Sequence, residues 1–121
     1  GYHTAGIRAL IRTVGFSETA DLLFTARRVS AAEARRIGLV NEVFAKDVLD
    51  EAVDQIAHTM ADNAPLTIQS AKISLHELAK LETQRDSDRI KASIERCYRS
   101  EDFKEGVRAF LEKRKPRFEG K

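Results

Sequence analysis

Hydrophobic residues recur at three- and four-residue steps along most of the chain, which is the spacing of amphipathic helices. The segment 1–15 predicts a first helix that ends at Gly15, and a second helix is expected to begin at Ser17. Ser30 and Glu33 predict the start of a third helix through a capping box, in which each side chain satisfies a backbone donor.

The middle of the chain contains one segment that favours an extended conformation. Gly38 is expected to close the third helix, and four of the six residues in 39–44 are apolar, which indicates a short strand or extended segment. No second segment is a secure pairing partner for it. From Asp47 the helical pattern returns and continues to a breaker at Asn63, and Pro65 suits the first turn of the helix that follows.

The last third of the chain predicts two further helices. A polar stretch over 82–88 indicates a break or an exposed extension before the first of them. The second is predicted over 100–116, with Ser100 as its N-cap and with acidic residues in its first turn. A basic cluster lies at its other end, before Pro116, which is expected to stop the helix: Lys113, Arg114 and Lys115. The fold class is therefore mainly α, a string of about six helices with almost no sheet.

Composition narrows the possible functions. The chain has 121 residues, 42% hydrophobic and 33% charged, which is ordinary for a globular domain and argues against disorder. Its net charge of +2 gives no reason to expect nucleic acid as a partner, and no apolar run is long enough to span a membrane. Cys97 is the only cysteine, which excludes an internal disulfide and favours a reducing, cytoplasmic location.

Three ordered blocks carry a resemblance to a known family: residues 25–44, 63–72 and 100–120. In order and spacing they resemble the crotonase (enoyl-CoA hydratase/isomerase) superfamily, and they match only the C-terminal part of a family member. The resemblance implies that residues 1–121 form the helical region that carries oligomerisation and coenzyme A contacts. The N-terminal ββα spiral core would be absent, and 1–15 would be the first helix after it.

The resemblance also implies a chemistry. Family members act on acyl-CoA thioesters, in fatty acid metabolism among other settings, through an enolate held by two backbone N–H groups, with carboxylates for proton transfer. Those parts would lie before Gly1, so no catalytic residue is assigned and the chain alone is expected to be inactive. The available carboxylates do not match the catalytic positions of the family and are interpreted as caps or solvated helix faces: Glu18, Glu33 and Glu42.

The resemblance implies a substrate-binding role for Phe110 and Lys113, which match family positions that approach coenzyme A, often across a subunit boundary. An aromatic ring can cover an adenine or an acyl chain, and a lysine suits a phosphate. Two simpler interpretations stay open: Phe110 as a core residue on one stripe with Phe103 and Val107, and Lys113 as a solvated cation. A homo-oligomer, trimer or dimer of trimers, is also implied, with no covalently bound cofactor.

Other candidate residues favour no separate chemistry. The histidines His3, His58 and His76 have no partners at metal-ligand spacing, so no metal site is predicted. His3 could carry a proton in an acyl pocket, although a histidine near a chain end is more often exposed. The segment 1–6 departs from the glycine-rich pattern common in the family, which leaves the reaction open. The basic cluster at 113–117 is too short for a nucleic-acid surface.

Two alternatives to a hydratase remain at this point. Isomerisation of a double bond or hydrolysis of a thioester would leave this region of a family member almost unchanged. A non-catalytic helical interaction module is the second alternative. It predicts that apolar positions such as Val53, Ile56 and Met60 are buried within one compact monomer.

Overall fold

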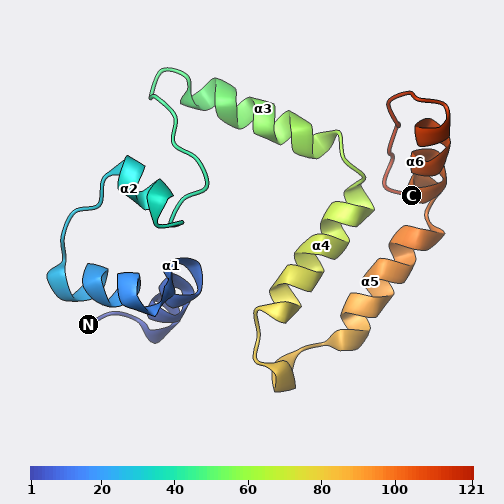
Figure 1. The fold of residues 1–121 in the computed structure, drawn as a ribbon. Coiled ribbons are helices and arrows are strands. Elements are labelled where there is room, and N and C mark those ends of the chain that lie inside the picture. Colours follow the sequence, from blue (N-terminus) through green and yellow to red (C-terminus); the bar gives the residue numbers. More distant parts are fainter. The chain divides into compact units, whose positions relative to one another are not determined.

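The computed structural model describes all 121 residues and contains six α-helices, one short 3-10 helix and no strand (Figure 1). The mainly α fold class predicted from the sequence is confirmed. The chain divides into two compact units, Gly1–Asp50 and Glu51–Lys121, which are described separately below.

The first unit begins with helix α1, Thr4–Thr25, which is kinked at Gly15. Gly15 has φ 84° and ψ 170°, a conformation that residues with a side chain rarely adopt. The break expected at Gly15 is therefore present, because its non-helical backbone separates two helical parts of α1. Thr19 supports the kink, because its hydroxyl donates a 2.7 Å hydrogen bond to the Gly15 carbonyl.

Helix α2, Ala31–Arg36, begins and ends as the sequence predicts. The hydroxyl of Ser30 accepts a hydrogen bond of 3.2 Å from the Glu33 N–H, which caps the first turn. The reciprocal half of the predicted capping box is absent, because the Glu33 carboxylate pairs with Arg27 and Arg36 instead. At the other end Gly38 has φ 76°, and the Leu39 N–H donates to the Ala34 carbonyl at 2.8 Å, as in a Schellman motif.

A strand or an extended segment was expected at residues 39–44, and of these two the strand is wrong. Residues 39–41 form bends, and residues 42–45 have no regular structure. The Leu39 and Val40 N–H groups both donate to the Ala34 carbonyl, so they are occupied by the end of α2. With no second strand in the structure, an apolar run of this length has no ladder to join.

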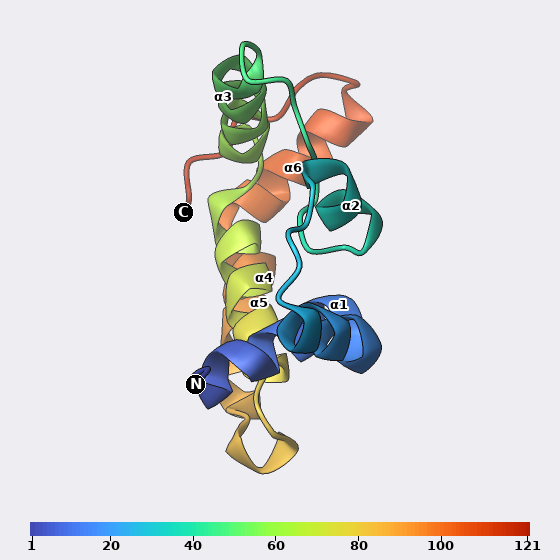
Figure 2. The same ribbon diagram turned by 90° about the vertical axis from the view of Figure 1, so that its left-hand side faces the viewer.

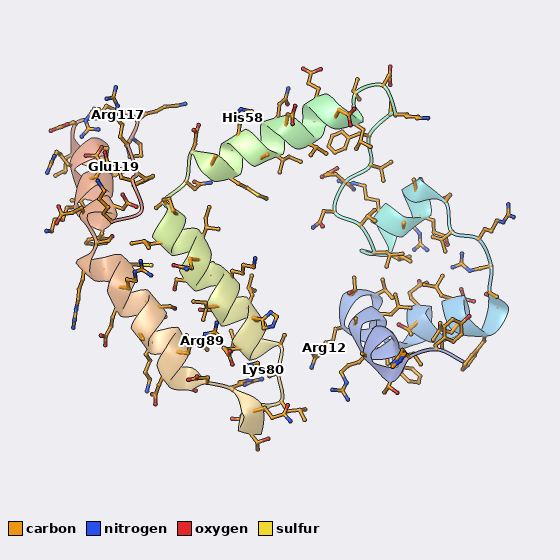
Figure 3. All side chains as sticks on the ribbon, turned by 180° about the vertical axis from the view of Figure 1, so that it is seen from behind. Arg12, His58, Lys80, Arg89, Arg117 and Glu119 are labelled. Atoms are coloured by element: carbon orange, nitrogen blue, oxygen red, sulfur yellow. The ribbon has the colours of Figure 1, made fainter.

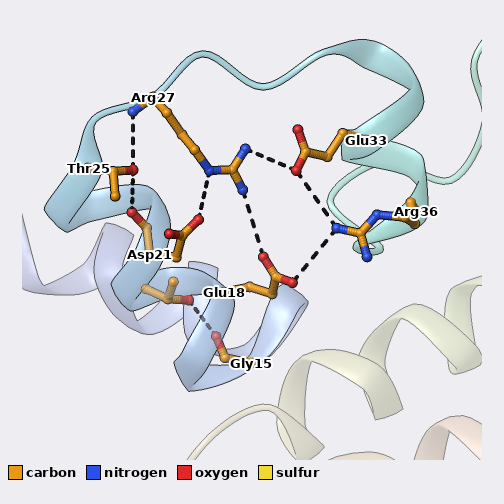
Figure 4. A network of polar contacts seen from close by, with 8 residues as sticks. Gly15, Glu18, Asp21, Thr25, Arg27, Glu33 and Arg36 are labelled. Carbon is orange, nitrogen blue, oxygen red and sulfur yellow. Dashed lines mark hydrogen bonds and ion pairs between the residues drawn. The ribbon is translucent and has the colours of Figure 1, made fainter.

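Ion pairs connect the end of α1 to α2 (Figure 4). The guanidinium group of Arg27 lies 2.7 Å from the Asp21 carboxylate, 3.0 Å from Glu33 and 4.0 Å from Glu18. Arg36 approaches Glu33 at 3.7 Å and Glu18 at 4.0 Å. These side chains are partly exposed, and water weakens exposed ion pairs, so the network sets geometry more than stability.

Four α-helices belong wholly or mainly to the second unit. They are α3 (Leu49–Ala61), α4 (Pro65–Leu78), α5 (Ser87–Arg99) and α6 (Glu101–Leu111), with the 3-10 helix η1 (Glu82–Gln84) between α4 and α5. Pro65 occupies the first turn of α4, as predicted. Helices α4 and α5 run side by side in opposite directions (Figures 1 and 2), and α6 follows α5 after Ser100.

A fully buried carboxylate closes the α4–α5 hairpin. Glu77 has no exposed surface, and its oxygens accept hydrogen bonds from the Lys80 ammonium at 2.7 and 2.8 Å. They also accept from the Arg89 guanidinium at 3.2 Å and from the Asp86 N–H at 3.0 Å. Figure 3 shows Lys80 and Arg89 near this end of the hairpin. The hydrogen bonds from Lys80 and Asp86 lower the pKa of Glu77, which keeps the buried group ionised.

Helix α6 begins as predicted but ends earlier than the sequence suggests. The Ser100 hydroxyl accepts a hydrogen bond of 3.0 Å from the Phe103 N–H, which confirms the cap. The predicted extension to Pro116 is wrong, because the last helical residue is Leu111. Lys113 adopts φ 52°, and the Arg114 N–H donates to the Ala109 carbonyl at 3.0 Å. A Schellman turn therefore stops the helix before the proline is reached.

We predict that Ser100→Ala lowers the free energy of unfolding by about 1 kcal/mol, because the Phe103 N–H loses its acceptor. Urea denaturation followed by circular dichroism measures the change. Ser87→Ala is the matched control, because Ser87 lies exposed in the first turn of α5, where Asp86 is the cap. An equal loss in both variants would contradict a capping role for Ser100.

Candidate functional site

Three helices of the second unit and the C-terminal tail line an apolar groove with a volume of about 650 Å³. Its walls come from α4, α5, α6 and residue 118, and they include Leu66, Ile94, Phe103, Phe110 and Phe118. Several of these side chains are only half covered, since Phe103 is 46% exposed and Ile94 is 41% exposed. The groove is therefore an open apolar surface rather than a closed core.

Phe110 and Lys113 both lie at the C-terminal end of α6. Phe110 is 83% exposed and lines the groove, so its interpretation as a core residue is wrong. Its stripe partner Val107 is also 48% exposed. The Lys113 N–H donates to the Phe110 carbonyl at 3.2 Å, so one turn of backbone joins the two residues. An exposed aromatic ring and a cation thus share one end of the groove-forming helix.

Neither Lys113 nor Arg117 makes an ion pair through its side chain, whereas the two basic residues between them do. Arg114 pairs with Glu105 and Glu112, and Lys115 lies 3.9 Å from Asp62. The side chain of Lys113 is therefore exposed and available to an anion.

The C-terminal tail folds back along α6 and is held by two carboxylates of that helix. Asp102 is 4% exposed and accepts hydrogen bonds from the Glu119 N–H at 2.7 Å and the Gly120 N–H at 2.8 Å. Glu105 accepts one from the Arg117 N–H at 2.9 Å. Figure 3 shows Arg117 and Glu119 on the tail beside α6. These contacts position the Phe118 ring over Gly106, at the wall of the groove.

Glu105 makes a second, stronger set of contacts with Arg114. The two guanidinium nitrogens Nη1 and Nη2 lie 2.6 and 3.0 Å from the two carboxylate oxygens, a bidentate arrangement. The hydrogen bonds from Arg114 and then from the Arg117 N–H lower the pKa of Glu105 to about 2. Glu105 is thus ionised at every physiological pH and holds the turn that contains Lys113.

Sequence reasoning missed Glu105, Arg114 and Asp102 as organisers of this region. Glu105 and Arg114 lie nine positions apart, and a continuous helix to Pro116 would have put their side chains on different turns. Only the early end of α6 turns Arg114 back towards Glu105. The signal available in the sequence was the combination of two carboxylates on α6 with a basic, glycine-containing tail.

The remaining candidates either do not line the groove or have local partners. His58 Nδ1 is 2.7 Å from the Asp54 carbonyl of its own helix, and His3 is exposed at the start of α1. Cys97 Sγ donates to the Leu66 carbonyl at 3.2 Å. No group of three or more His, Cys, Asp and Glu side chains is arranged to hold a metal ion. None of the helices combines the length and the apolar character needed to cross a membrane.

The three carboxylates set aside in the sequence analysis form ion pairs. Glu18 and Glu33 belong to the network around Arg27 and Arg36, and Glu42 accepts two hydrogen bonds of 3.1 Å from Arg35. Those contacts lower the pKa of Glu42, so it is a poor proton donor near neutrality. None of the three lies at the groove.

Comparison with known proteins identifies the family. The family model described as Enoyl-CoA hydratase/isomerase matches residues 3–121, almost the whole chain. The chain belongs to the enoyl-CoA hydratase/isomerase family. The resemblance seen in the three sequence blocks is therefore confirmed.

Curated relatives include enzymes of several acyl-CoA reactions. Methylmalonyl-CoA decarboxylase of Escherichia coli is 38% identical over 98% of this chain and 46% of its own length. The 2,3-dehydroadipyl-CoA hydratase of the same organism is 34% identical over 96% of this chain and 46% of its length. The chain thus spans about half the length of these two relatives.

Solved structures of the family share the arrangement of helices. The enoyl-CoA hydratase from Bacillus anthracis superposes with a TM-score of 0.86 at 32% identity, over 96% of this chain and 45% of that one. A putative enoyl-CoA hydratase/isomerase family protein from Hyphomonas neptunium gives 0.87 at 30% identity, over 100% of this chain and 46% of that one. This coverage by an all-helical chain fits the expected C-terminal helical part of the crotonase fold.

We predict that acid frees the part of the tail around Arg117 from α6. The pKa of Glu105 is lowered from 4.5 to about 2, so its contribution to stability is complete above pH 4.5 and is lost as the pH falls towards 2. The protection of the Arg117 amide, which is its exchange rate relative to an unfolded peptide at the same pH, should fall over this range, as measured by NMR. In Glu105→Gln the amide should exchange rapidly already at pH 6. A protected Arg117 amide in that variant would contradict the role of Glu105.

Proposed function

We propose that this chain is the C-terminal helical part of an enzyme that acts on acyl-CoA thioesters, with enoyl-CoA hydration or isomerisation as its reaction. One observation carries the proposal. An exposed Phe110 ring and Lys113, whose ammonium group makes no ion pair, lie at the same end of α6 in a chain of the enoyl-CoA hydratase/isomerase family. Its relatives include a 2,3-dehydroadipyl-CoA hydratase and short-chain-enoyl-CoA hydratases.

In this proposal Phe110 and Lys113 contact coenzyme A. The phenyl ring offers a flat apolar face to an adenine or an acyl chain, and the ammonium group offers a point charge to a phosphate. Since Lys113 has no carboxylate to release, an incoming phosphate would not have to break an existing ion pair. Both residues are exposed, so a ligand, or a neighbouring subunit that carries one, can reach them.

The reacting groups lie outside this chain in the proposal. An enolate mechanism needs two aligned backbone N–H donors for the thioester oxygen and a carboxylate that exchanges protons with the substrate. Glu18, Glu33 and Glu42 are committed to arginines, and the groove is almost entirely apolar. The chain therefore supplies binding and packing surfaces. A homo-oligomer and a reducing, cytoplasmic location, favoured by the unpaired Cys97, complete the proposal.

A second candidate reaction is decarboxylation of a malonyl-type thioester. The relative named methylmalonyl-CoA decarboxylase is 38% identical over 98% of this chain. Loss of carbon dioxide from such a substrate leaves its bonding electrons on the α-carbon, which generates the same thioester enolate. Hydration, isomerisation and decarboxylation, which share this enolate, and thioester hydrolysis, which does not need it, would use one coenzyme A contact surface and differ elsewhere.

A non-catalytic interaction module receives less support. That alternative requires the apolar face of α3 to be buried within one monomer, but Val53 is 52% exposed, Ile56 43% and Met60 59%. The apolar face of α3 is instead exposed and can pack against a surface that these helices do not provide.

We predict that the chain binds coenzyme A and that Lys113→Gln weakens this binding about threefold to tenfold, because one phosphate contact is lost. NMR titration of the labelled chain with coenzyme A measures the affinity. Pantetheine, which lacks the nucleotide phosphates, should bind equally to both proteins. Phe110→Ala should weaken coenzyme A binding as well.

Lys115→Gln is the matched control, because it removes an equal charge from a neighbouring residue whose side chain is 94% exposed. It should leave the affinity unchanged within twofold. Equal losses in Lys113→Gln and Lys115→Gln would contradict a specific phosphate contact. An absence of coenzyme A binding at millimolar concentrations would contradict the proposed contact altogether.

A further inference from the structure

Lys113 occupies a backbone conformation that a lysine does not favour. Its φ of 52° lies in the left-handed region, and Ala26 is the only other residue with a side chain that has a positive φ. This conformation is unfavourable for residues with a Cβ atom, because that atom crowds the backbone carbonyl oxygen. It is the position of a Schellman turn at which glycine is usual. The surrounding contacts must therefore hold the turn in place.

Those contacts converge on Glu105. Its carboxylate accepts two hydrogen bonds from the guanidinium group of Arg114, the residue directly after Lys113. It accepts a third from the Arg117 N–H, which fixes the chain four residues after Lys113. The Glu105 side chain is only 17% exposed, so these bonds are partly shielded from water. The turn is thus fixed from its C-terminal side by one carboxylate.

The backbone fixes the same turn from its N-terminal side. The Lys113 N–H donates to the Phe110 carbonyl at 3.2 Å, and the Arg114 N–H donates to the Ala109 carbonyl at 3.0 Å. Ala109 is 1% exposed, so this end of α6 is anchored in the packed part of the unit. Lys113 is the residue between these two sets of contacts, and its side chain has no partner of its own.

We propose that Glu105 is a positioning residue for Lys113: through Arg114 and the Arg117 N–H it holds the left-handed turn that presents the Lys113 ammonium group to a phosphate of coenzyme A. This inference rests on the proposed contact between Lys113 and coenzyme A. It gives Glu105 a role in binding, although Glu105 would not touch coenzyme A and would act on Lys113 through the backbone. Arg114 has a structural role in this arrangement, because its charge is already committed to Glu105 and Glu112.

An alternative is that Glu105 only ties down the tail. In that case its loss would destabilise residues 115–121 without changing how Lys113 meets a phosphate. The two roles differ in their coupling to Lys113, since a positioning residue has nothing left to position once the lysine charge is removed. A double-mutant cycle therefore separates them.

The test uses the full chain in four forms, namely wild type, Glu105→Gln, Lys113→Gln and the double variant, with coenzyme A as the probe. We expect Glu105→Gln to weaken binding by about the same threefold to tenfold factor as Lys113→Gln. The double variant should be no weaker than Lys113→Gln alone. Pantetheine binding should not change in any form, and the Arg117 amide should exchange at least about tenfold faster in Glu105→Gln.

Glu101→Gln is the matched control, since it removes one carboxylate from the same helix, where Glu101 pairs only with Lys104 at 2.6 Å. It should leave coenzyme A affinity unchanged. Losses that multiply in the double variant, or a Glu105→Gln protein that binds coenzyme A as the wild type does, would overturn the positioning role and leave the Lys113 contact standing. An unaffected affinity in Lys113→Gln would instead overturn the proposed contact, and the positioning role with it.

Discussion

Every helix of this chain carries apolar residues, yet the buried apolar residues are only Ala34, Leu66 and Ala109. Stability in a globular domain comes mainly from apolar surface removed from water, at roughly 25 cal/mol per Å². Many large apolar side chains on α3, α4, α5 and α6 are nevertheless between 41% and 83% exposed. The chain buries too little of its own apolar surface, and this constraint shapes the rest of the structure. The exposed apolar faces need a protein surface that the helices themselves do not supply.

Hydrogen bonds to buried polar groups fix many of the turns and helix ends. Glu77 closes the α4–α5 hairpin, Asp102 holds the tail, and Ser100 joins α5 to α6 by accepting from the Phe103 N–H and donating to the Cys97 carbonyl. Hydrogen bonds are directional, so they fix the positions of turns and helix ends, whereas apolar contacts would allow neighbouring elements to shift. The proposed coenzyme A contact lies at one of these defined ends, because the tail contacts to Glu105 determine where Lys113 stands.

Local signals in the sequence predicted the elements well. Caps and breakers act within one turn, so Ser30, Gly38, Pro65 and Ser100 could be interpreted from their immediate neighbours, and each has the predicted role. The predictions were wrong where residues distant in the sequence determine the local structure. The end of α6 depends on a left-handed Lys113 and on Glu105, nine positions before Arg114, and the apolar run at 39–44 lacks a strand partner that composition alone could not exclude.

The measurement that tests this account most directly is sedimentation velocity of the 121-residue chain over a hundredfold range of concentration, with binding of a hydrophobic dye measured on the same samples. Uncovered apolar faces predict that the chain associates as its concentration rises and that it binds the dye while remaining helical. A monomer at every concentration that excludes the dye and unfolds cooperatively would show that the chain covers its own apolar surface. That result would contradict the claim that these helices require a further surface.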